Sequence, residues 1–130
     1  HPSTKEQETE ILLVEDNEIN QSIFKMSLEK FGFACDIAEN GQEGIERYEA
    51  SPYKLIFMDI RMPVMDGIIC TGKIRQFEIK NDLKPSKIIA FTANAMIGDK
   101  EKYLEAGMDD FLAKPFVPNQ IKALIDKYLM

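Results

Sequence analysis

Short apolar segments alternate with amphipathic segments along almost the whole chain, and this alternation limits the possible folds more than any other feature. The segments 10–14, 33–37, 55–58, 87–91 and 111–113 are short, apolar and bounded by charged or turn residues, which is typical of strands buried on both faces. The segments 19–31, 42–50, 67–77, 93–106 and 118–129 carry apolar residues at helical spacing. Five strands alternating with five helices predict an α/β fold with one parallel sheet and helices on both of its faces.

For five such units we expect a flavodoxin-like, doubly wound sheet with the strand order 2-1-3-4-5. A chain of 130 residues is the size of one domain with a full hydrophobic core. We expect residues 1–9, which are polar, to be a linker remnant and residues 10–130 to be the domain. The chain starts His-Pro-Ser rather than with Met, as expected for a piece cut from a longer protein.

Composition excludes several classes of function. The net charge of -6 argues against a general nucleic-acid surface, and the absence of a long apolar run argues against a membrane span. His1 is the single histidine, so the fold holds no Ser-His or Cys-His catalytic pair. Cys35 and Cys70 lie in apolar contexts without metal-ligand spacing, and we expect both to be reduced core residues of a cytoplasmic protein.

Chemically reactive side chains follow the predicted strands at the point where each strand ends. They are Glu15 and Asp16 after the first strand, Asp59 after the third, Thr92 after the fourth and Lys114 after the fifth. In the expected strand order the first and third strands are neighbours, and the crevice at their carboxyl ends is where such sheets bind ligands. Each residue also has an ordinary interpretation as a helix cap or a solvated charge. Five such residues on strand ends are better explained by one site.

This set of residues suits phosphoryl transfer. Three clustered carboxylates repel one another unless a cation lies among them, and Mg²⁺ is the hard ion that such oxygen ligands favour. Thr92 and Lys114 offer a hydroxyl and an ammonium to phosphoryl oxygens. The sequence therefore predicts that Asp59 is a nucleophile that becomes an acyl phosphate, with Mg²⁺ and Lys114 neutralising the charge of the transferred group.

From about residue 9 to residue 130 the chain resembles the response-regulator receiver domain. The resemblance is carried by the order and spacing of four motifs: LVEDN at 13–17, MDIRMPVMDG at 58–67, IAFTA at 89–93 and KP at 114–115. It implies that Asp59 is the phospho-acceptor, that Thr92 is the switch hydroxyl and that Lys114 binds the phosphate. It also implies three further features: Glu15 and Asp16 as acids of the Mg²⁺ site together with Asp59 and the backbone carbonyl of Arg61, Phe111 as the switch aromatic, and a cis Lys114–Pro115 peptide bond.

Two of these positions depart from what is frequent in the family. Many members carry Tyr at the position of Phe111, so the hydroxyl of that residue is missing here. Arg61 stands where a small or amide residue is expected, and we expect its long cationic side chain to affect the lifetime of the acyl phosphate.

The resemblance is strongest to receiver modules of hybrid sensor histidine kinases, through NEIN at 17–20, TANAM at 92–96 and GMDD at 107–110. It implies a histidine kinase or a histidine phosphotransfer domain as partner. Because the first helix lies beside the crevice, we expect the partner to dock on its residues Ile19, Asn20 and Ile23, for which simple packing is the alternative interpretation. The resemblance implies a domain that catalyses its own Mg²⁺-dependent phosphorylation and dephosphorylation and contains no kinase catalytic domain. No direct contact with nucleic acid or membrane is expected; a weak homodimer and membrane anchoring of the parent protein are left open.

Three alternative functions fit the sequence less well. A degenerate receiver that acts only through protein contacts is disfavoured by the presence of all five site residues. A haloacid-dehalogenase-like phosphohydrolase usually has a second acid two residues after its nucleophile, and that position is Arg61. A flavin-binding domain needs a phosphate-cradling loop rich in Ser, Thr and Gly after the first strand, and this turn is acidic.

Overall fold

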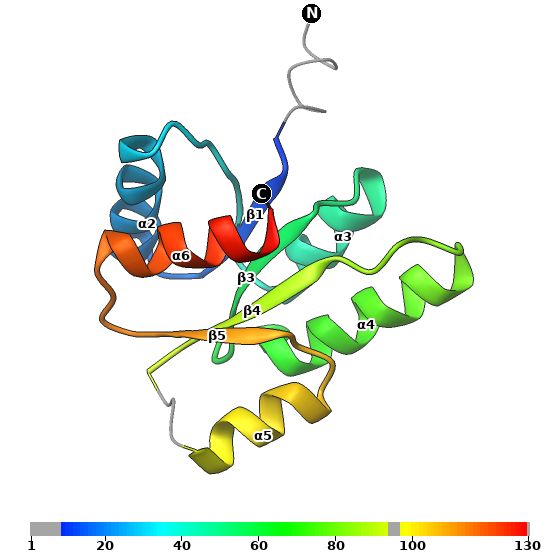
Figure 1. Cartoon of the computed structure of the whole chain (residues 1–130). Coiled ribbons are helices and arrows are strands. Elements are labelled where there is room, and N and C mark those ends of the chain that lie inside the picture. The colour runs from blue at the N-terminus through cyan, green and yellow to red at the C-terminus, as the bar shows by residue number, and fades with distance from the viewer. Residues whose placement is uncertain (1–8, 94–96, 130) are drawn as a thin grey trace, which may run out of the picture.

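The computed structural model describes residues 9–93 and 97–129 and contains one five-stranded parallel sheet in the order β2-β1-β3-β4-β5 (Figure 1). The strands are β1 (Ile11–Val14), β2 (Asp36–Ala38), β3 (Leu55–Asp59), β4 (Lys87–Thr92) and β5 (Asp110–Ala113). The helices are α2 (Glu18–Lys30), α3 (Gly41–Ala50), α4 (Gly67–Lys80), α5 (Ile97–Glu105) and α6 (Pro118–Tyr128). The expected fold class and strand order are confirmed.

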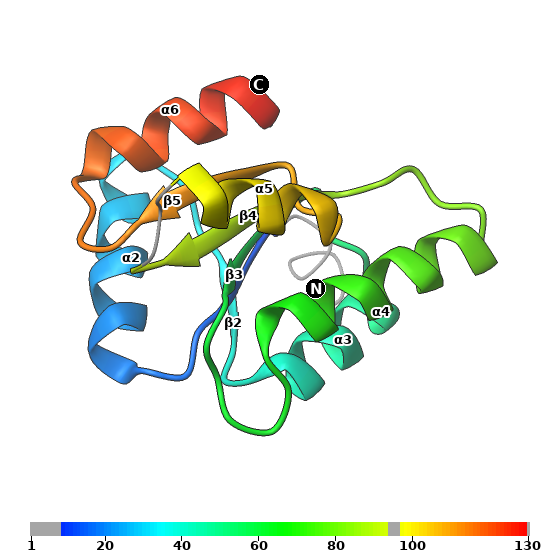
Figure 2. The same ribbon diagram turned by 90° about the horizontal axis from the view of Figure 1, so that it is seen from below.

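The sheet separates two hydrophobic cores, because alternate residues of each central strand point to opposite faces. Leu12, Ile56 and Ile88 pack on the side that α3, α4 and α5 cover. Leu13, Phe57 and Ile89 pack on the side that α2 and α6 cover. The two layers of helices are seen in Figure 1 and, from below, in Figure 2. Burial on both faces explains why the central strands are continuously apolar.

Short polar side chains fix the starts of three helices. The side chain of Asn17 accepts a hydrogen bond from the backbone N–H of Asn20, as expected for a helix cap, and Asn40 and Asp66 do the same for α3 and α4. Gly67 follows its cap directly, at a position where a Cβ would collide with the carbonyl oxygen of Asp59. The loop after β3 therefore returns tightly against the end of that strand.

Several element ends differ from the sequence prediction. Strand β2 begins at Asp36 rather than at residue 33, and α4 continues to Lys80, three residues past the predicted end. Ile69, one of the apolar residues whose spacing predicts this helix, is 52% exposed and does not pack in the core. The helix predicted over 93–106 is α5; positions 94–96 lie outside the described residues.

Two further expectations concern the covalent chain. The Lys114–Pro115 peptide bond is cis, as the resemblance implied. Both cysteines are free thiols, Cys70 buried and Cys35 half-buried. Within residues 9–93 and 97–129, none of the helices combines the length and the apolar character needed to cross a membrane.

Candidate phosphoryl-transfer site

Three carboxylates gather where β1 and β3 end. Val14 pairs with Met58 across these adjacent parallel strands, so Glu15 and Asp59, the next residue of each strand, lie side by side. One carboxylate oxygen from each of Glu15, Asp16 and Asp59 lies within 4.8 Å of the others. Glu15 and Asp59 are buried, whereas Asp16 is exposed. The sequence prediction that these acids come together is confirmed.

The cluster opens into a cavity of about 340 Å³. Its walls bring together residues from four strand ends and the start of α2: Glu15, Asp16, Asn17, Asn20, Asp59, Arg61, Thr92, Ala93 and Lys114. All five residues predicted from the strand ends thus face one hollow. A larger hollow of about 520 Å³ shares Arg61 with it and lies against Ile60, Met62 and Ile68.

Lys114 is the cation of the site. Its Nζ lies 2.9 Å from Glu15 Oε1 and 3.3 Å from Asp59 Oδ1, and 4.6 Å from the centroid of the Phe91 ring. The chain places it there because the backbone N–H of Lys114 donates to the carbonyl oxygen of Thr92 at 2.8 Å, which continues the pairing of β4 with β5 by one residue. The ammonium therefore bridges the two buried carboxylates.

Both carboxylate oxygens of Glu15 accept hydrogen bonds. Oε1 accepts from Lys114, and Oε2 accepts from the backbone N–H of Asn17 at 3.0 Å. The side-chain amide of Gln21 in α2 donates to the Glu15 carbonyl oxygen at 2.6 Å. These bonds fix the acidic turn between β1 and α2 before any ligand arrives.

The surroundings of Asp59 disfavour the ionised form of its carboxyl group. Burial, and next to it the charge of Glu15, raises the pKa of the Asp59 carboxyl from 3.8 to about 7, against the opposing effect of Lys114. One ammonium faces three carboxylates, so a divalent cation among them would relieve the repulsion that remains. Carboxylate oxygens with one exposed member are the ligand set that Mg²⁺ takes, keeping several waters. The residues present fit that ion.

Thr92 lines the same cavity and directly follows Phe91, which pairs with Asp59 across β3 and β4. It is buried, and its Oγ1 lies 3.1 Å from the phenol oxygen of Tyr103 in α5. Tyr103 was given no role in the sequence analysis, because a Tyr within an amphipathic helix has the pattern of an ordinary core residue. Phe111 is half-buried in β5, with the Lys100 Nζ of α5 4.2 Å from its ring centroid.

Comparisons with known proteins agree with this geometry. The family model described as the response regulator receiver domain matches residues 11–126, and the chain belongs to that family. It is 43% identical over 127 residues to hybrid signal transduction histidine kinase G of Dictyostelium discoideum, covering 96% of this chain and 4% of the relative. It is 37% identical to the aerobic respiration control sensor protein ArcB of Escherichia coli K12, covering 91% of this chain and 15% of the relative. The chain thus spans a small part of these longer proteins.

Two solved structures are similar over nearly the whole chain. The receiver domain of the sensor histidine kinase PA1611 from Pseudomonas aeruginosa PAO1, with a magnesium ion in its active-site cleft, is 39% identical with a TM-score of 0.81, covering 93% of this chain and 97% of that one. The receiver domain of Ssk1 from Saccharomyces cerevisiae, crystallised with the histidine phosphotransfer protein Ypd1, is 35% identical with a TM-score of 0.87, covering 92% of this chain and 88% of that one. This chain is a receiver domain of two-component signalling, with an acidic pocket of Glu15, Asp16 and Asp59 for phosphoryl transfer.

Proposed function

We propose that Asp59 accepts a phosphoryl group from a phosphohistidine of a histidine kinase or histidine phosphotransfer domain. The observation that carries the proposal is the position of the Asp59 carboxylate, at the floor of a cavity that also holds two further acids, a hydroxyl and an ammonium. In the step, an Asp59 oxygen attacks phosphorus as the bond from phosphorus to the imidazole nitrogen breaks. The imidazole leaves with the electron pair, and the product is an acyl phosphate.

Each residue of the site would have a separate role in this reaction. Lys114 already contacts Asp59 and is within reach of a phosphoryl group attached to it, so it would neutralise charge on the transferred oxygens. The Thr92 hydroxyl would donate to one of those oxygens. Glu15, Asp16, Asp59 and the Arg61 backbone carbonyl would hold Mg²⁺. When bound, that ion neutralises charge on the acids and on the phosphoryl oxygens.

The donor is proposed to dock on the start of α2. Asn20 lines the cavity, and Ile19 and Ile23 of the same helix are 69% and 48% exposed. Exposed apolar side chains beside a reactive cavity suit a protein donor better than a small molecule. The similarity to a receiver that was crystallised with a histidine phosphotransfer protein supports this type of partner.

The similarity to hybrid histidine kinases also bears on the longer protein to which this domain would belong. We propose that residues 10–130 form the receiver module of a hybrid histidine kinase, with residues 1–9 as a linker. The free thiols of Cys35 and Cys70 support a cytoplasmic location for the module.

The test is intact-mass spectrometry after incubation with Mg²⁺ and a small phosphodonor such as acetyl phosphate. The wild-type protein should gain the mass of one phosphoryl group. Asp59→Ala and wild-type protein with chelated metal should gain none. If wild type gains no mass with a small donor and none from a phosphorylated histidine phosphotransfer protein, the chain acts through protein contacts alone.

A further inference from the structure

The phenol of Tyr103 connects the reactive cavity to helix α5. Tyr103 is 4% exposed, and its oxygen lies 3.1 Å from Thr92 Oγ1, which is itself buried. Thr92 lines the same cavity as Asp59. A residue of the cavity wall is therefore hydrogen-bonded to a side chain of α5, and none of residues 98–105 of this helix lines the cavity itself.

Tyr103 is also a contact between α5 and the hydrophobic core. Among residues 98–105, the part of α5 whose side chains the structure describes, Tyr103 alone is buried. Leu104 beside it is 56% exposed. A change in the position of the Tyr103 ring is therefore transmitted directly to the helix.

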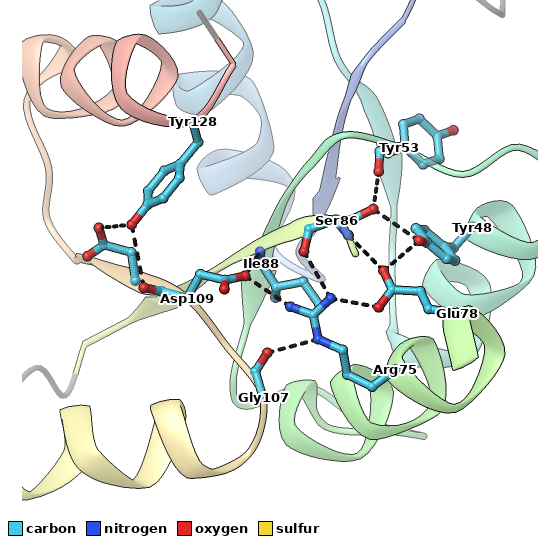
Figure 3. Close-up of polar contacts among 10 residues, drawn as sticks. Tyr48, Tyr53, Arg75, Glu78, Ser86, Ile88, Gly107, Asp109 and Tyr128 are labelled. Carbon is cyan, nitrogen blue, oxygen red and sulfur yellow. Dashed lines mark hydrogen bonds and ion pairs between the residues drawn. The ribbon is translucent and has the colours of Figure 1, made fainter. Parts of the chain in front are cut away.

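The end of α5 is fixed separately, by Arg75 of α4. The Arg75 Nε donates to the Gly107 carbonyl oxygen at 3.0 Å, and Nη2 contacts Asp109 Oδ2 at 2.9 Å, both in the segment between α5 and β5 (Figure 3). The same guanidinium donates to Glu78 Oε1 at 2.8 Å and to the Ser86 carbonyl oxygen at 2.9 Å. The chain just after α5 is thus tied to α4 and to the start of β4, whereas within residues 98–105 of the helix itself the buried contact is Tyr103.

A phosphoryl group on Asp59 would compete for the Thr92 hydroxyl. Either hydroxyl of the Thr92–Tyr103 pair can be the donor. In both cases a negatively charged phosphoryl oxygen is a stronger acceptor for the Thr92 proton than a neutral phenol, so Thr92 is drawn toward the phosphoryl group. Thr92 cannot move toward the phosphoryl group and keep a 3.1 Å contact with Tyr103 unless α5 follows.

We propose that the Tyr103–Thr92 hydrogen bond holds α5 in its unmodified position, and that phosphorylation of Asp59 breaks it, so that α5 moves about the end that Arg75 fixes. This inference rests on the proposed phosphorylation of Asp59. According to this inference, the first side chain to move when Thr92 moves is Tyr103 of α5, rather than Phe111 of β5. The Lys100–Phe111 contact then places the Phe111 ring next to the helix that moves.

The first test uses unmodified protein and amide hydrogen exchange of α5. Tyr103→Phe keeps the ring and removes the hydroxyl, so α5 amides should exchange about fivefold faster than in wild type, the change expected for one lost hydrogen bond. Thr92→Val should give the same increase. The double variant should stay at about fivefold, since both substitutions remove one shared bond. Tyr53→Phe is the matched control, because Tyr53 is 6% exposed and donates to Asp36 on the β2 side of the sheet; it should leave α5 unchanged.

The second test adds the phosphoryl group, with its incorporation verified by intact mass. Phosphorylated wild type should show α5 exchange near that of Tyr103→Phe, and phosphorylated Tyr103→Phe should differ little from its unmodified form. Two results would overturn the proposal. One is an α5 exchange rate in unmodified Tyr103→Phe equal to that of wild type. The other is a rate in the double variant that is the product of the two single increases. If no mass is gained, the proposed function has failed and the release step fails with it, while the unmodified comparison still decides whether Tyr103 holds α5.

Discussion

At the scale of single residues, the folded protein disfavours the ionised form of the Asp59 carboxyl, because the group is buried next to Glu15. Its pKa is about 7 in the folded state against an ordinary 3.8, so the folded protein binds the Asp59 proton more tightly than the unfolded chain does. The contribution of this group to stability is therefore present below pH 3.8 and is lost as the pH rises from about 4 to about 7. Ionised Asp59 is a cost to the metal-free fold.

We predict that Asp59→Asn removes this cost. In metal-free buffer the free energy of unfolding of the variant should exceed that of wild type by about 1–2 kcal/mol at pH 8, and the difference should shrink toward pH 4. Urea denaturation at a series of pH values measures it. Asp126→Asn, in an exposed pair with Lys122 on α6, should show little difference at any of these pH values. A difference for Asp59→Asn that does not vary with pH would contradict the assignment.

Arg61 is an exposed cationic residue among those that line the cavity. A long cationic side chain there would screen an acyl phosphate on Asp59 from water. We predict that Arg61→Ala shortens the half-life of phosphorylated Asp59 by about two- to fivefold, the effect of one solvent-exposed charge. Loss of the phosphoryl mass with time gives the rate, and Arg47→Ala on the exposed face of α3 is the control. Equal half-lives for Arg61→Ala and wild type would rule out this role.

At the scale of elements, α4 is longer than its apolar pattern predicts because of a buried polar network. Glu78 is 3% exposed although it follows the last predicted residue of the helix. Its Oε2 accepts from the Tyr48 phenol at 2.7 Å and from the Ser86 backbone N–H at 2.8 Å, and its Oε1 pairs with Arg75 (Figure 3). A charged residue after an apolar run resembles the start of a loop, and its partners lie 30 residues before it and 8 after it in sequence.

We predict that Arg75→Met destabilises the domain by about 2–4 kcal/mol, because it leaves a buried carboxylate without its cation. The midpoint of urea unfolding should fall with little change in slope. Lys73→Met, on the exposed face of the same helix, should change the free energy of unfolding by less than about 0.5 kcal/mol. A loss of similar size in both variants would mean that the network contributes nothing specific.

The sequence predicts elements better than it predicts the contacts between them. The strands β3 and β4 are found within one residue of their expected ends, since apolar runs buried on both faces have no other good interpretation. Strand β2 at the sheet edge is shorter than expected, because Phe33 packs on the core from outside the strand and does not extend it. Ile69 is exposed because α4 buries a narrow stripe of its surface, which helical spacing alone does not locate.

At the scale of the whole molecule, strand order is what made the candidate site predictable. Once β1 and β3 are neighbours, the residues after their last apolar positions must meet, and the register of Val14 with Met58 bears this out. The Tyr103–Thr92 and Arg75–Asp109 contacts were not predicted. Each depends on how a helix is rotated on the sheet, and a Tyr or Arg on a helix carries no sequence signal of its partner.

The charge distribution of the whole fold gives the last prediction. The chain carries a net charge of -6, and one carboxylate oxygen from each of three acids lies within 4.8 Å of the others where β1 and β3 end. The unfolded chain does not bring these acids together, so a divalent cation binds the folded state selectively and stabilises it by RT ln(1 + [L]/Kd). At a Mg²⁺ concentration ten times the Kd, this stabilisation amounts to about 1.4 kcal/mol, or a rise in Tm of about 3–6 °C for a domain of this size.

Thermal unfolding with and without Mg²⁺ measures this rise in Tm, with NaCl at equal ionic strength as the control for screening. The rise should be lost in Asp16→Asn and in Asp59→Asn and kept in Asp126→Asn; an equal rise in NaCl would show that the acids are screened and that no ion is bound at the site.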